Sequence, residues 1–480
     1  MTGSPATRRA LDAVVVGSGP NGLAAAIDLA RAGRSVHVIE AADTLGGGNR
    51  TSELTLPGFR HDLCSTVVPL AAGSPFFRSV DLARHGIEWA HPPVALAHLL
   101  RPERAVLLHR SLDATVEELG RDGAAWARLM GPLAREWDRL ADHVLGPPIR
   151  FPRHPLLLAR FGLPSLLPGD VLPRLVFREP AARALFTGIA AHSMVRLSAP
   201  LTSAFGIVLA TLAHRFDWPL VRGGIGRLAD ALVAEAMELG VTFETGHTVA
   251  SLAELPPSRA VVLDVTPRQV LAIAGDRLPA GYRRGLERYR YGPGVFKVDW
   301  ALDGPVPWRD HAVAGAGTVH LSGSSRAIAA AEDAVARGRH PERPFILFVQ
   351  PTVADPTRAP AGKHVAWAYC HVPNGSPVDM THVLEGEVER HAPGFRDLIL
   401  ARSVKGPAAM EAHDANYIGG DINGGIQDLW QALFRPVVAW DPYATPLEGL
   451  FLCSSSTPPG GGVHGMSGRH AARSVLRRIG

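Results

Sequence analysis

Three glycines near the amino terminus, Gly17, Gly19 and Gly22, have the G-x-G-x-x-G spacing of a loop that binds a pyrophosphate. The first glycine of such a loop permits a tight turn, the second lets the backbone approach the phosphates, and the third lets a helix pack closely on a strand. Glu40 follows at the distance where a carboxylate accepts hydrogen bonds from ribose hydroxyls, and glutamate there disfavours a 2′-phosphate. We therefore expect a dinucleotide site that includes Gly17, Gly19, Pro20, Asn21, Gly22 and Glu40.

The chain around this loop predicts the elements that would position it. Residues 13–16 are short, continuous and β-branched, as in a buried parallel strand, and residues 35–39 predict a second strand. Between them, residues 23–32 are rich in Ala and Leu and predict a helix, which Gly33 ends in the C′ position. A strand, a glycine loop, a helix and a second strand in this order distinguish a nucleotide-binding unit from a chance glycine-rich turn.

Two further glycine runs favour FAD over NAD. Residues 46–51 read G-G-G-N-R-T, where Arg50 would reach a pyrophosphate or the flavin, and an NAD-only domain does not need this run. Residues 460–468 read G-G-G-V-H-G-M-S-G and lie between a predicted strand at 449–453 and a predicted helix from His470. A long cofactor that spans two loops requires such a second crossover from strand to helix.

Together with these loops, further motifs resemble the phytoene-desaturase-like branch of the FAD-dependent amine-oxidase superfamily. This group includes bacterial relatives of pyridine nucleotide-disulfide oxidoreductase domain-containing protein 2, and the resemblance covers nearly the whole chain. The motifs are R-G-G at 222–224 with Leu228 before a helix, G-H-T-V at 246–249, P-G-V-F-K-V-D-W at 293–300, G-G-D-I-N-G-G at 419–425 and Y-A-T-P at 443–446.

The resemblance implies an α/β fold, with a Rossmann-like FAD-binding domain assembled from discontinuous segments and a mixed α+β substrate domain. The FAD-binding domain would comprise residues 11–80, 220–275 and 445–480. The substrate domain would comprise residues 81–219 and 276–444.

The resemblance also implies that FAD is the cofactor and places particular residues beside it. Residues 246–249 would form a strand near the adenine, and the loop 460–468 would lie close to the isoalloxazine. His464 in that loop is a candidate catalytic residue or covalent attachment point, with a structural histidine as the alternative. The further cofactor-binding residues implied are Gly47, Gly48, Arg50, Val249, Gly461, Gly462, Val463 and Gly468.

The implied reaction is a hydride transfer between flavin and a small, mainly apolar organic substrate, as in desaturases and dehydrogenases. A flavin amine oxidase and a non-catalytic flavin-binding scaffold are the alternatives. The motifs specify neither the electron acceptor nor the oligomeric state.

Cysteine usage argues against a dithiol activity. Cys64, Cys370 and Cys453 lie far apart and form no C-x-x-C pair, so we expect a reducing compartment and no disulfide reductase chemistry. The pair Arg8-Arg9 is similar to a twin-arginine signal, but the apolar run that follows leads straight into the first glycine loop. We therefore expect a cytoplasmic protein.

Composition excludes other classes. The 480 residues are 46% hydrophobic and 20% charged, which suits a large folded core rather than disorder. The net charge of +4 is scattered, and aromatic residues make up only 6%, so we expect no nucleic-acid binding. No uninterrupted apolar run approaches the roughly 18 residues of a spanning helix.

Three other features have more than one interpretation. Residues 224–229 fit G-x-G-x-x-A, the pattern of a second dinucleotide site. Pro219 cannot donate a hydrogen bond within a central strand before this motif, so we favour a glycine turn that lets the following helix pack closely. Asp421 and Asn423 would line a pocket or form turns. Residues 145–175, rich in Pro, Leu and Arg, would admit an apolar substrate, touch anionic lipid as a peripheral membrane contact, or form ordinary helix packing.

Residues 329–335 predict a helix whose acidic residues are solvated. The 21 histidines form no spacing typical of a metal site, so we expect no metal.

Overall fold

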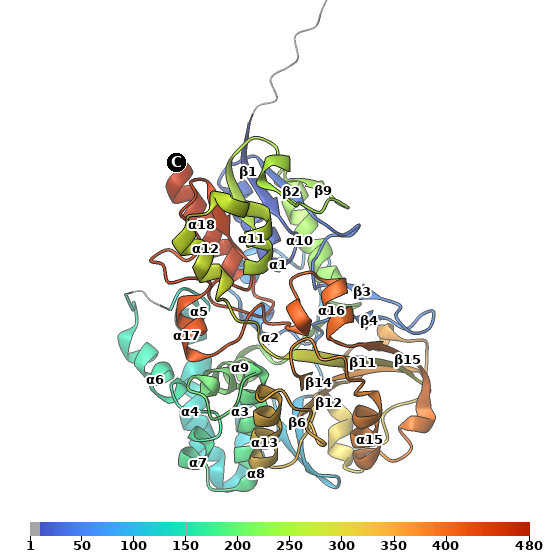
Figure 1. Ribbon diagram of the computed structural model, residues 1–480. Coiled ribbons are helices and arrows are strands. Elements are labelled where there is room, and N and C mark those ends of the chain that lie inside the picture. Colours follow the sequence, from blue (N-terminus) through green and yellow to red (C-terminus); the bar gives the residue numbers. More distant parts are fainter. Residues whose placement is uncertain (1–9, 149–150) are drawn as a thin grey trace, which may run out of the picture.

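The computed structural model describes residues 10–148 and 151–480. A five-stranded parallel sheet forms one end of the molecule, and a larger, mostly antiparallel sheet and a group of helices form the other (Figure 1). Arg8, Arg9 and Arg150 lie outside the described residues.

The parallel sheet is built from strands that are distant in the sequence. Its order is β16 (Leu450–Leu452), β10 (Ser258–Leu263), β1 (Leu11–Val16), β2 (Val36–Ile39) and β9 (Thr242–Glu244). All four pairings are parallel, and Val15 lies between Val262 and Val38. The carboxyl ends of these strands therefore meet along one edge of the sheet.

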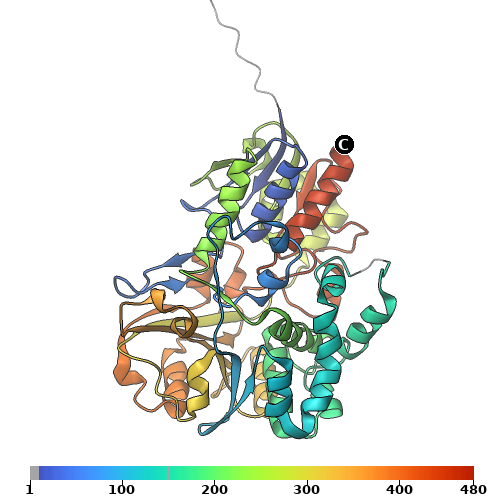
Figure 2. The ribbon, with the colours of Figure 1, turned by 180° about the vertical axis from the view of Figure 1, so that it is seen from behind.

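Helices cover both faces of the parallel sheet. Side chains alternate along β1, so that Ala13 and Val15 pack in one apolar cluster and Val14 and Val16 pack in another. The first face is covered by α1 (Pro20–Arg31), α10 (Gly226–Glu238) and α18 (Met466–Ile479), which lie side by side (Figure 2). The other face is covered by α11 (Pro267–Ala274) and α12 (Ala280–Glu287).

The second sheet has seven strands in the order β15 (Ile399–Lys405), β11 (Gly294–Leu302), β14 (His364–Val372), β13 (Ile346–Val349), β12 (Ala316–Leu321), β6 (Val94–Arg101) and β7 (Arg104–Leu108). The β12–β6 pair is parallel, and the other pairs are antiparallel. One face packs on α15 (Thr381–His391), and the other faces α8 (Pro180–Ala190) and α13 (Ser325–Ala336).

The remaining elements surround these two sheets. The helical group also contains α3 (Leu112–Leu119), α4 (Gly123–Arg135), α5 (Trp137–Val144), α6 (Pro155–Ser165), α7 (Leu172–Val176) and α9 (Thr202–Phe216). The short helices are α2 (Pro69–Gly73), α14 (Pro351–Ala354), α16 (Pro407–His413) and α17 (Leu429–Phe434). Two small ribbons pair β3 (Thr51–Ser52) with β4 (His61–Asp62) and β5 (Trp89–Ala90) with β8 (Leu220–Val221).

The predicted α/β fold is confirmed, and so is the predicted unit β1, α1, β2. Gly33 has φ 76° and follows Ala32, the C-cap of α1, as the sequence predicted. Among the described residues, no helix combines the length and the apolar character needed to cross a bilayer.

Three local predictions were wrong. Residues 246–249 form no strand, because β9 ends at Glu244. Helix α18 starts at Met466, one turn before His470. Glu332 on α13 is not solvated: it is buried and lies 2.9 Å from Nδ1 of His371, so tertiary contact overrode the local polar pattern.

Candidate dinucleotide site and adjoining cavity

The first glycine loop connects the carboxyl end of β1 to α1. Gly17 has φ 99°, a conformation that favours glycine, and Pro20 is the first residue of the helix. A Cβ on Gly22 would lie 2.1 Å from the carbonyl oxygen of Gly17, so only glycine fits there. The predicted role of the third glycine in close packing therefore matches the backbone geometry.

Glu40, directly after β2, fixes the glycine loop from the side. Its Oε2 accepts hydrogen bonds from the backbone N–H of Ser18 at 2.8 Å and from the Ser18 hydroxyl at 2.6 Å. Its Oε1 accepts from the N–H of Ala42 at 3.0 Å. The Ser18 hydroxyl in turn accepts from the N–H of Gly46 at 3.0 Å, so this buried carboxylate joins the first two glycine runs.

Asp264, directly after β10, is a site residue that the sequence analysis missed. Its Oδ2 accepts a hydrogen bond from the N–H of Gly22 at 2.8 Å, and a Cβ on Gly19 would lie 2.8 Å from that same oxygen. Burial raises the pKa of Asp264 to about 8, and the charges of Asp414 and Glu40 add to the rise. The sequence does contain a pattern that indicates Asp264. This residue directly follows the apolar run 260–263, just as Glu40 directly follows the predicted strand that includes residues 36–39.

The second glycine run lies against the first. A Cβ on Gly47, which has φ 58°, would lie 2.7 Å from the Cα of Gly19. A Cβ on Gly48 would overlap the hydroxyl of Tyr417 at 1.9 Å. Arg50 donates to the carbonyl oxygen of Thr44 at 2.7 Å, which holds its guanidinium beside the same space.

These loops enclose a cavity of about 670 Å³ at the carboxyl edge of the parallel sheet. The predicted site residues that line it are Gly17, Gly19, Pro20, Asn21, Glu40, Gly47, Gly48, Arg50, Val249, Gly462 and Val463. Residues that line it without having been predicted include Ser18, Cys64, Asp264, Asp414, Asn416 and Tyr417. Asp414, Asn416 and Tyr417 follow α16, far along the chain from either glycine motif.

The donors and acceptors around this cavity fit a nucleotide. Asn21 Oδ1, Asn49 Nδ2 and Arg50 Nε are buried and find no hydrogen-bond partner within the described protein. Buried polar atoms are normally paired, so these three atoms mark a place where a polar ligand completes the structure. The cavity also lies where open parallel sheets bind nucleotides, outside the carboxyl ends of the strands.

The carboxyl-terminal loop contributes unevenly. Gly462 and Val463 line the large cavity, and Gly461 lines a smaller one beside it. Gly468 lines neither: it sits where α18 crosses α1, and a Cβ there would lie 1.8 Å from the carbonyl oxygen of Asn21. Gly22 likewise lies behind the cavity wall.

His464 is buried and lines neither cavity. Its Nε2 donates to the carbonyl oxygen of Gly460 at 3.0 Å, and its Nδ1 accepts from the N–H of Met466 at 3.0 Å. Burial lowers the pKa of His464 to about 4, so the ring is neutral. Both ring nitrogens are thus used to shape the loop, which favours a positioning role.

The smaller cavity, of about 200 Å³, adjoins the larger one. Both are lined by Cys64, Ser65, Ile422, Asn423, Gly462 and Val463. The rest of the smaller cavity is lined mainly by apolar and aromatic side chains of α2, α9 and the second sheet, including Leu70, Phe205, Leu209, Leu347, Val349 and Trp367. A molecule there would meet a nucleotide bound in the larger cavity.

Two of the ambiguous motifs have structural roles. Gly224 and Gly226 pack against Thr51, whose hydroxyl accepts from the N–H of Gly226 at 2.9 Å, so the start of α10 is capped by protein. Asp421 accepts from the N–H groups of Gly292, Asn423 and Gly425 and therefore organises turns.

One cluster of metal-ligand type does exist among the described residues. Ligand atoms of His85, Glu235 and Glu238 lie within 4.8 Å of one another, a grouping that the sequence did not predict. Arg31 and Arg84 form ion pairs with these carboxylates, so the charge of the cluster is balanced within the protein.

Comparison with known proteins agrees with this geometry. Residues 15–80 match the NAD(P)-binding Rossmann-like domain. The chain is 28% identical to pyridine nucleotide-disulfide oxidoreductase domain-containing protein 2 of Mus musculus, over 98% of this chain and 94% of that protein. It is 27% identical to a phytoene dehydrogenase of Streptomyces griseus, over 81% of this chain and 77% of that protein.

The resemblance to the phytoene-desaturase-like group is confirmed. A solved structure of cyclohexylamine oxidase from Brevibacterium oxydans is 13% identical and has a TM-score of 0.56, with 98% of this chain and 99% of that chain covered. This likeness shows that the chain shares its fold with that oxidase.

Proposed function

We propose that this protein is an FAD-dependent oxidoreductase of the desaturase or dehydrogenase type, which transfers a hydride between a compact, mainly apolar organic substrate and the flavin. The observation that carries the proposal is the shared wall of the two cavities, formed by Cys64, Ser65, Ile422, Asn423, Gly462 and Val463. When bound, FAD supplies the hydride acceptor or donor.

The residues of the larger cavity have distinct roles in this proposal. Glu40 holds the glycine loop and accepts from the ribose, while the N–H groups at the start of α1 face the pyrophosphate. Arg50 offsets the negative charge of the pyrophosphate and of the nearby carboxylates. FAD is favoured over NAD because all three glycine runs line one continuous cavity.

The remaining predicted contacts form the two ends of the site. Val249 lines the end beside Glu40, where we place the adenine, and Gly462 and Val463 line the end that meets the smaller cavity, where we place the isoalloxazine. Gly461 shapes the substrate side, while Gly22 and Gly468 allow α1 and α18 to approach the site closely.

The smaller cavity determines the class of substrate. Its volume of about 200 Å³ lies below the roughly 300–1,000 Å³ typical of pockets for drug-sized ligands, so the substrate is compact. Among the described residues that line it, none is Asp, Glu, Lys or Arg. The cavity therefore suits a neutral molecule.

The far end of the smaller cavity offers two polar groups. Thr318 Oγ1 is buried and finds no partner among the described residues. His192 lies 3.1 Å from His320 between their Nε2 atoms, and burial lowers the pKa of His192 to about 3, so its ring is neutral. These groups suit a substrate with one hydroxyl or carbonyl group.

The amine-oxidase alternative is less well supported. Trp367 and Tyr369 stack in the smaller cavity with their ring centroids 5.8 Å apart. In other proteins, aromatic rings that line a site bind ammonium groups through cation–π interactions. Here the ammonium of Lys297 already lies 4.9 Å from the ring centroid of Trp367. This ammonium, which is paired with Asp299, therefore already occupies the position over the Trp367 ring that a cationic amine would take.

The test is anaerobic reduction of the FAD-loaded protein by matched compounds. Cyclohexanol, cyclohexanone and cyclohexylamine differ mainly in their polar group, and bleaching of the flavin absorption band reports hydride transfer. Reduction by a neutral compound supports the proposal, whereas reduction by amines alone assigns an amine oxidase. Normal FAD binding with no reduction across a broad panel of neutral compounds and amines would favour the non-catalytic scaffold.

A further inference from the structure

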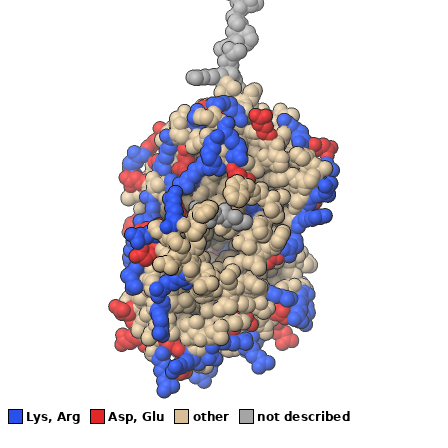
Figure 3. Space-filling view, turned by 90° about the vertical axis from the view of Figure 1, so that its left-hand side faces the viewer, with Lys and Arg blue, Asp and Glu red and all other residues tan. Residues whose placement is uncertain are grey.

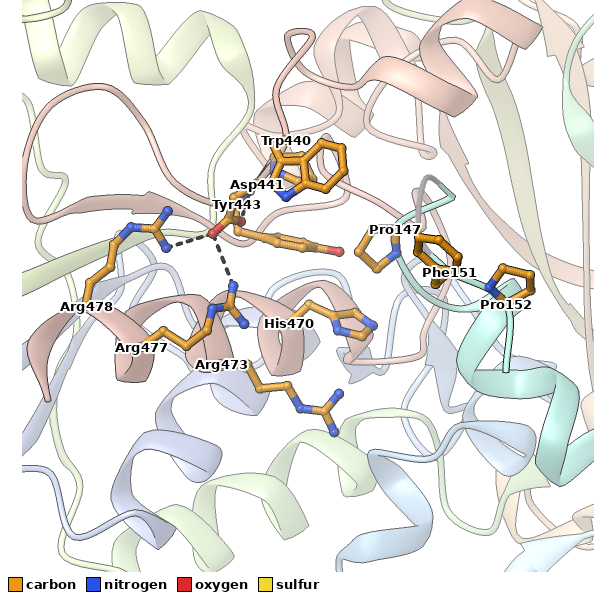
Figure 4. Close-up of a pocket in the computed structure, with 11 residues that line it drawn as sticks. Pro147, Phe151, Pro152, Trp440, Asp441, Tyr443, His470, Arg473, Arg477 and Arg478 are labelled. Carbon is orange, nitrogen blue, oxygen red and sulfur yellow. Dashed lines mark hydrogen bonds and ion pairs between the residues drawn. The ribbon is translucent and has the colours of Figure 1, made fainter. Parts of the chain in front are cut away.

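A surface groove of about 930 Å³ lies away from both cavities. It is lined by Pro147, Phe151 and Pro152, by residues 440–443 and by side chains of helix α18. Phe151 is 97% exposed and Trp440 is 94% exposed, and they project from different segments beside the groove (Figure 4). Two large aromatic side chains left almost wholly in water are unusual for a surface with no partner.

Further exposed apolar side chains lie on two helices, α6 and α17, on the same side of the molecule (Figure 1). Leu156, which is 87% exposed, and Leu163 lie on α6, and Trp430 lies on α17. Helix α6 has the sequence P-L-L-L-A-R-F-G-L-P-S, in which Arg160 is the single charged residue. We call Phe151, Leu156, Leu163, Trp430 and Trp440 the apolar face.

The charges beside the apolar face are mainly positive. Arg473, Arg477 and Arg478 on α18 are exposed and line the groove. Arg160 lies on α6, and Arg153 shortly precedes that helix. Arg477 and Arg478 share one carboxylate, that of Asp441, at 3.2 and 2.7 Å, so one positive charge is left over. Figure 3 shows this side of the molecule, with a largely uncharged centre and Lys and Arg side chains along its borders.

We propose that the apolar face docks on the surface of an anionic lipid bilayer. Aromatic and leucine side chains enter the boundary between headgroups and acyl chains, while arginines contact lipid phosphates. Each basic side chain near an anionic surface contributes favourably, so the positive excess selects anionic over zwitterionic lipid.

The position of α6 links this surface to the smaller cavity. Helix α6 packs on α9, and α9 contributes Phe205 and Leu209 to the cavity wall. A bilayer under α6 is therefore one helix away from the proposed substrate site. This link rests on the proposed function, but docking itself does not.

Co-sedimentation of the FAD-loaded protein with vesicles tests the inference. One set of vesicles is phosphatidylcholine alone, and the other contains phosphatidylcholine with phosphatidylglycerol. We expect binding to the anionic vesicles to be at least tenfold stronger, and to weaken when the salt concentration rises from about 0.1 to 0.5 M.

The variants separate the two parts of the surface. Phe151→Ser combined with Trp440→Ser should weaken binding to anionic vesicles at least tenfold, and Arg473→Gln combined with Arg478→Gln should remove most of the salt dependence. Met237→Ser and Arg326→Gln, at exposed positions on α10 and α13, are the controls and should bind like the wild type.

Three results would overturn the inference: no binding to anionic vesicles, unchanged binding by the Phe151/Trp440 variant, or equal loss in the controls. Light scattering without lipid provides a further check. A dimer that Trp440→Ser dissociates, with no vesicle binding, would assign the face to self-association instead. The flavin content of every variant is measured as well, so failure of docking is distinguishable from failure of the proposed function.

Discussion

The Oδ2 atom of Asp264 accepts a hydrogen bond from the backbone N–H of Gly22 at 2.8 Å, across 242 positions of the sequence. This bond joins the end of β10 to the first turn of α1 and so holds the glycine loop in place between β1 and α1. Because burial raises the pKa of Asp264 to about 8, the bond is made by a carboxyl group that is largely protonated at neutral pH.

The pKa of Asp264 makes stability depend on pH. Above its ordinary pKa of 3.8 the unfolded chain loses this proton, whereas the folded protein retains it until about pH 8. The contribution of Asp264 to stability therefore falls by up to about 1.4 kcal/mol per pH unit between these values. Asp264→Asn keeps an acceptor for Gly22 and removes the ionisation.

We expect nucleotide-free Asp264→Asn protein to melt at a higher temperature than the wild type at pH 8, with the difference vanishing near pH 4. Asp12→Asn is the control, and it should lower the melting temperature at pH 8 instead of raising it. Hydrogen bonds from Ser35 lower the pKa of Asp12, so ionised Asp12 stabilises the folded wild type. Melting curves that run parallel for wild type and Asp264→Asn across this pH range would refute the assignment.

Glu40→Ala should weaken the binding of FAD by about 10- to 100-fold, because the glycine loop loses its acceptors and the ribose loses a charge-assisted one. The measurement is the dissociation constant from fluorescence quenching during FAD titration. Glu53→Ala, at an exposed position on the same domain, is the control. An unchanged dissociation constant in Glu40→Ala would remove Glu40 from the site.

His464→Ala should lower FAD retention several-fold and leave the rate of flavin reduction, measured on FAD-loaded protein, close to that of the wild type. The reason is that both ring nitrogens bind loop backbone, at Gly460 and Met466. Normal FAD retention with much slower reduction by substrate would instead make His464 catalytic.

Thr318→Val should weaken binding of a compact ketone or alcohol in the smaller cavity by about 5- to 10-fold, since it removes one hydrogen bond of about 1 kcal/mol. Thr318→Ser keeps the hydroxyl and should retain most of the affinity. The perturbation of the flavin spectrum during titration with cyclohexanone is the readout, and methylcyclohexane is the apolar reference. Equal affinities in Thr318→Val and Thr318→Ser would show that the hydroxyl is not used.

The elements close to the glycine motif were predictable because they follow local rules. The order of β1, the loop, α1 and β2 depends on apolar periodicity and on the conformations that Gly17 and Gly33 permit. The residues that complete the cavity from distant segments, Asp414 and Tyr417 among them, were not predictable in this way. They reach Gly48 and the surroundings of Glu40 only when the segment that follows α16 folds against the glycine loops.

The burial of a charged residue also could not be predicted from the neighbouring sequence alone. Glu332 has the sequence surroundings of a solvated helix face, yet its carboxylate is buried against His371 on β14. Glu332 is buried because His371, 39 residues further along the chain on the neighbouring strand, forms a hydrogen bond with its carboxylate.

Every role proposed for the glycine loops depends on FAD binding in the larger cavity. The direct measurement is to incubate the purified protein with FAD and NAD together, remove the free nucleotides, denature the protein and identify what is released by chromatography and mass. We predict FAD at close to one molecule per chain. Release of NAD, or of no nucleotide from protein that is folded by circular dichroism, would show that the larger cavity is not an FAD site.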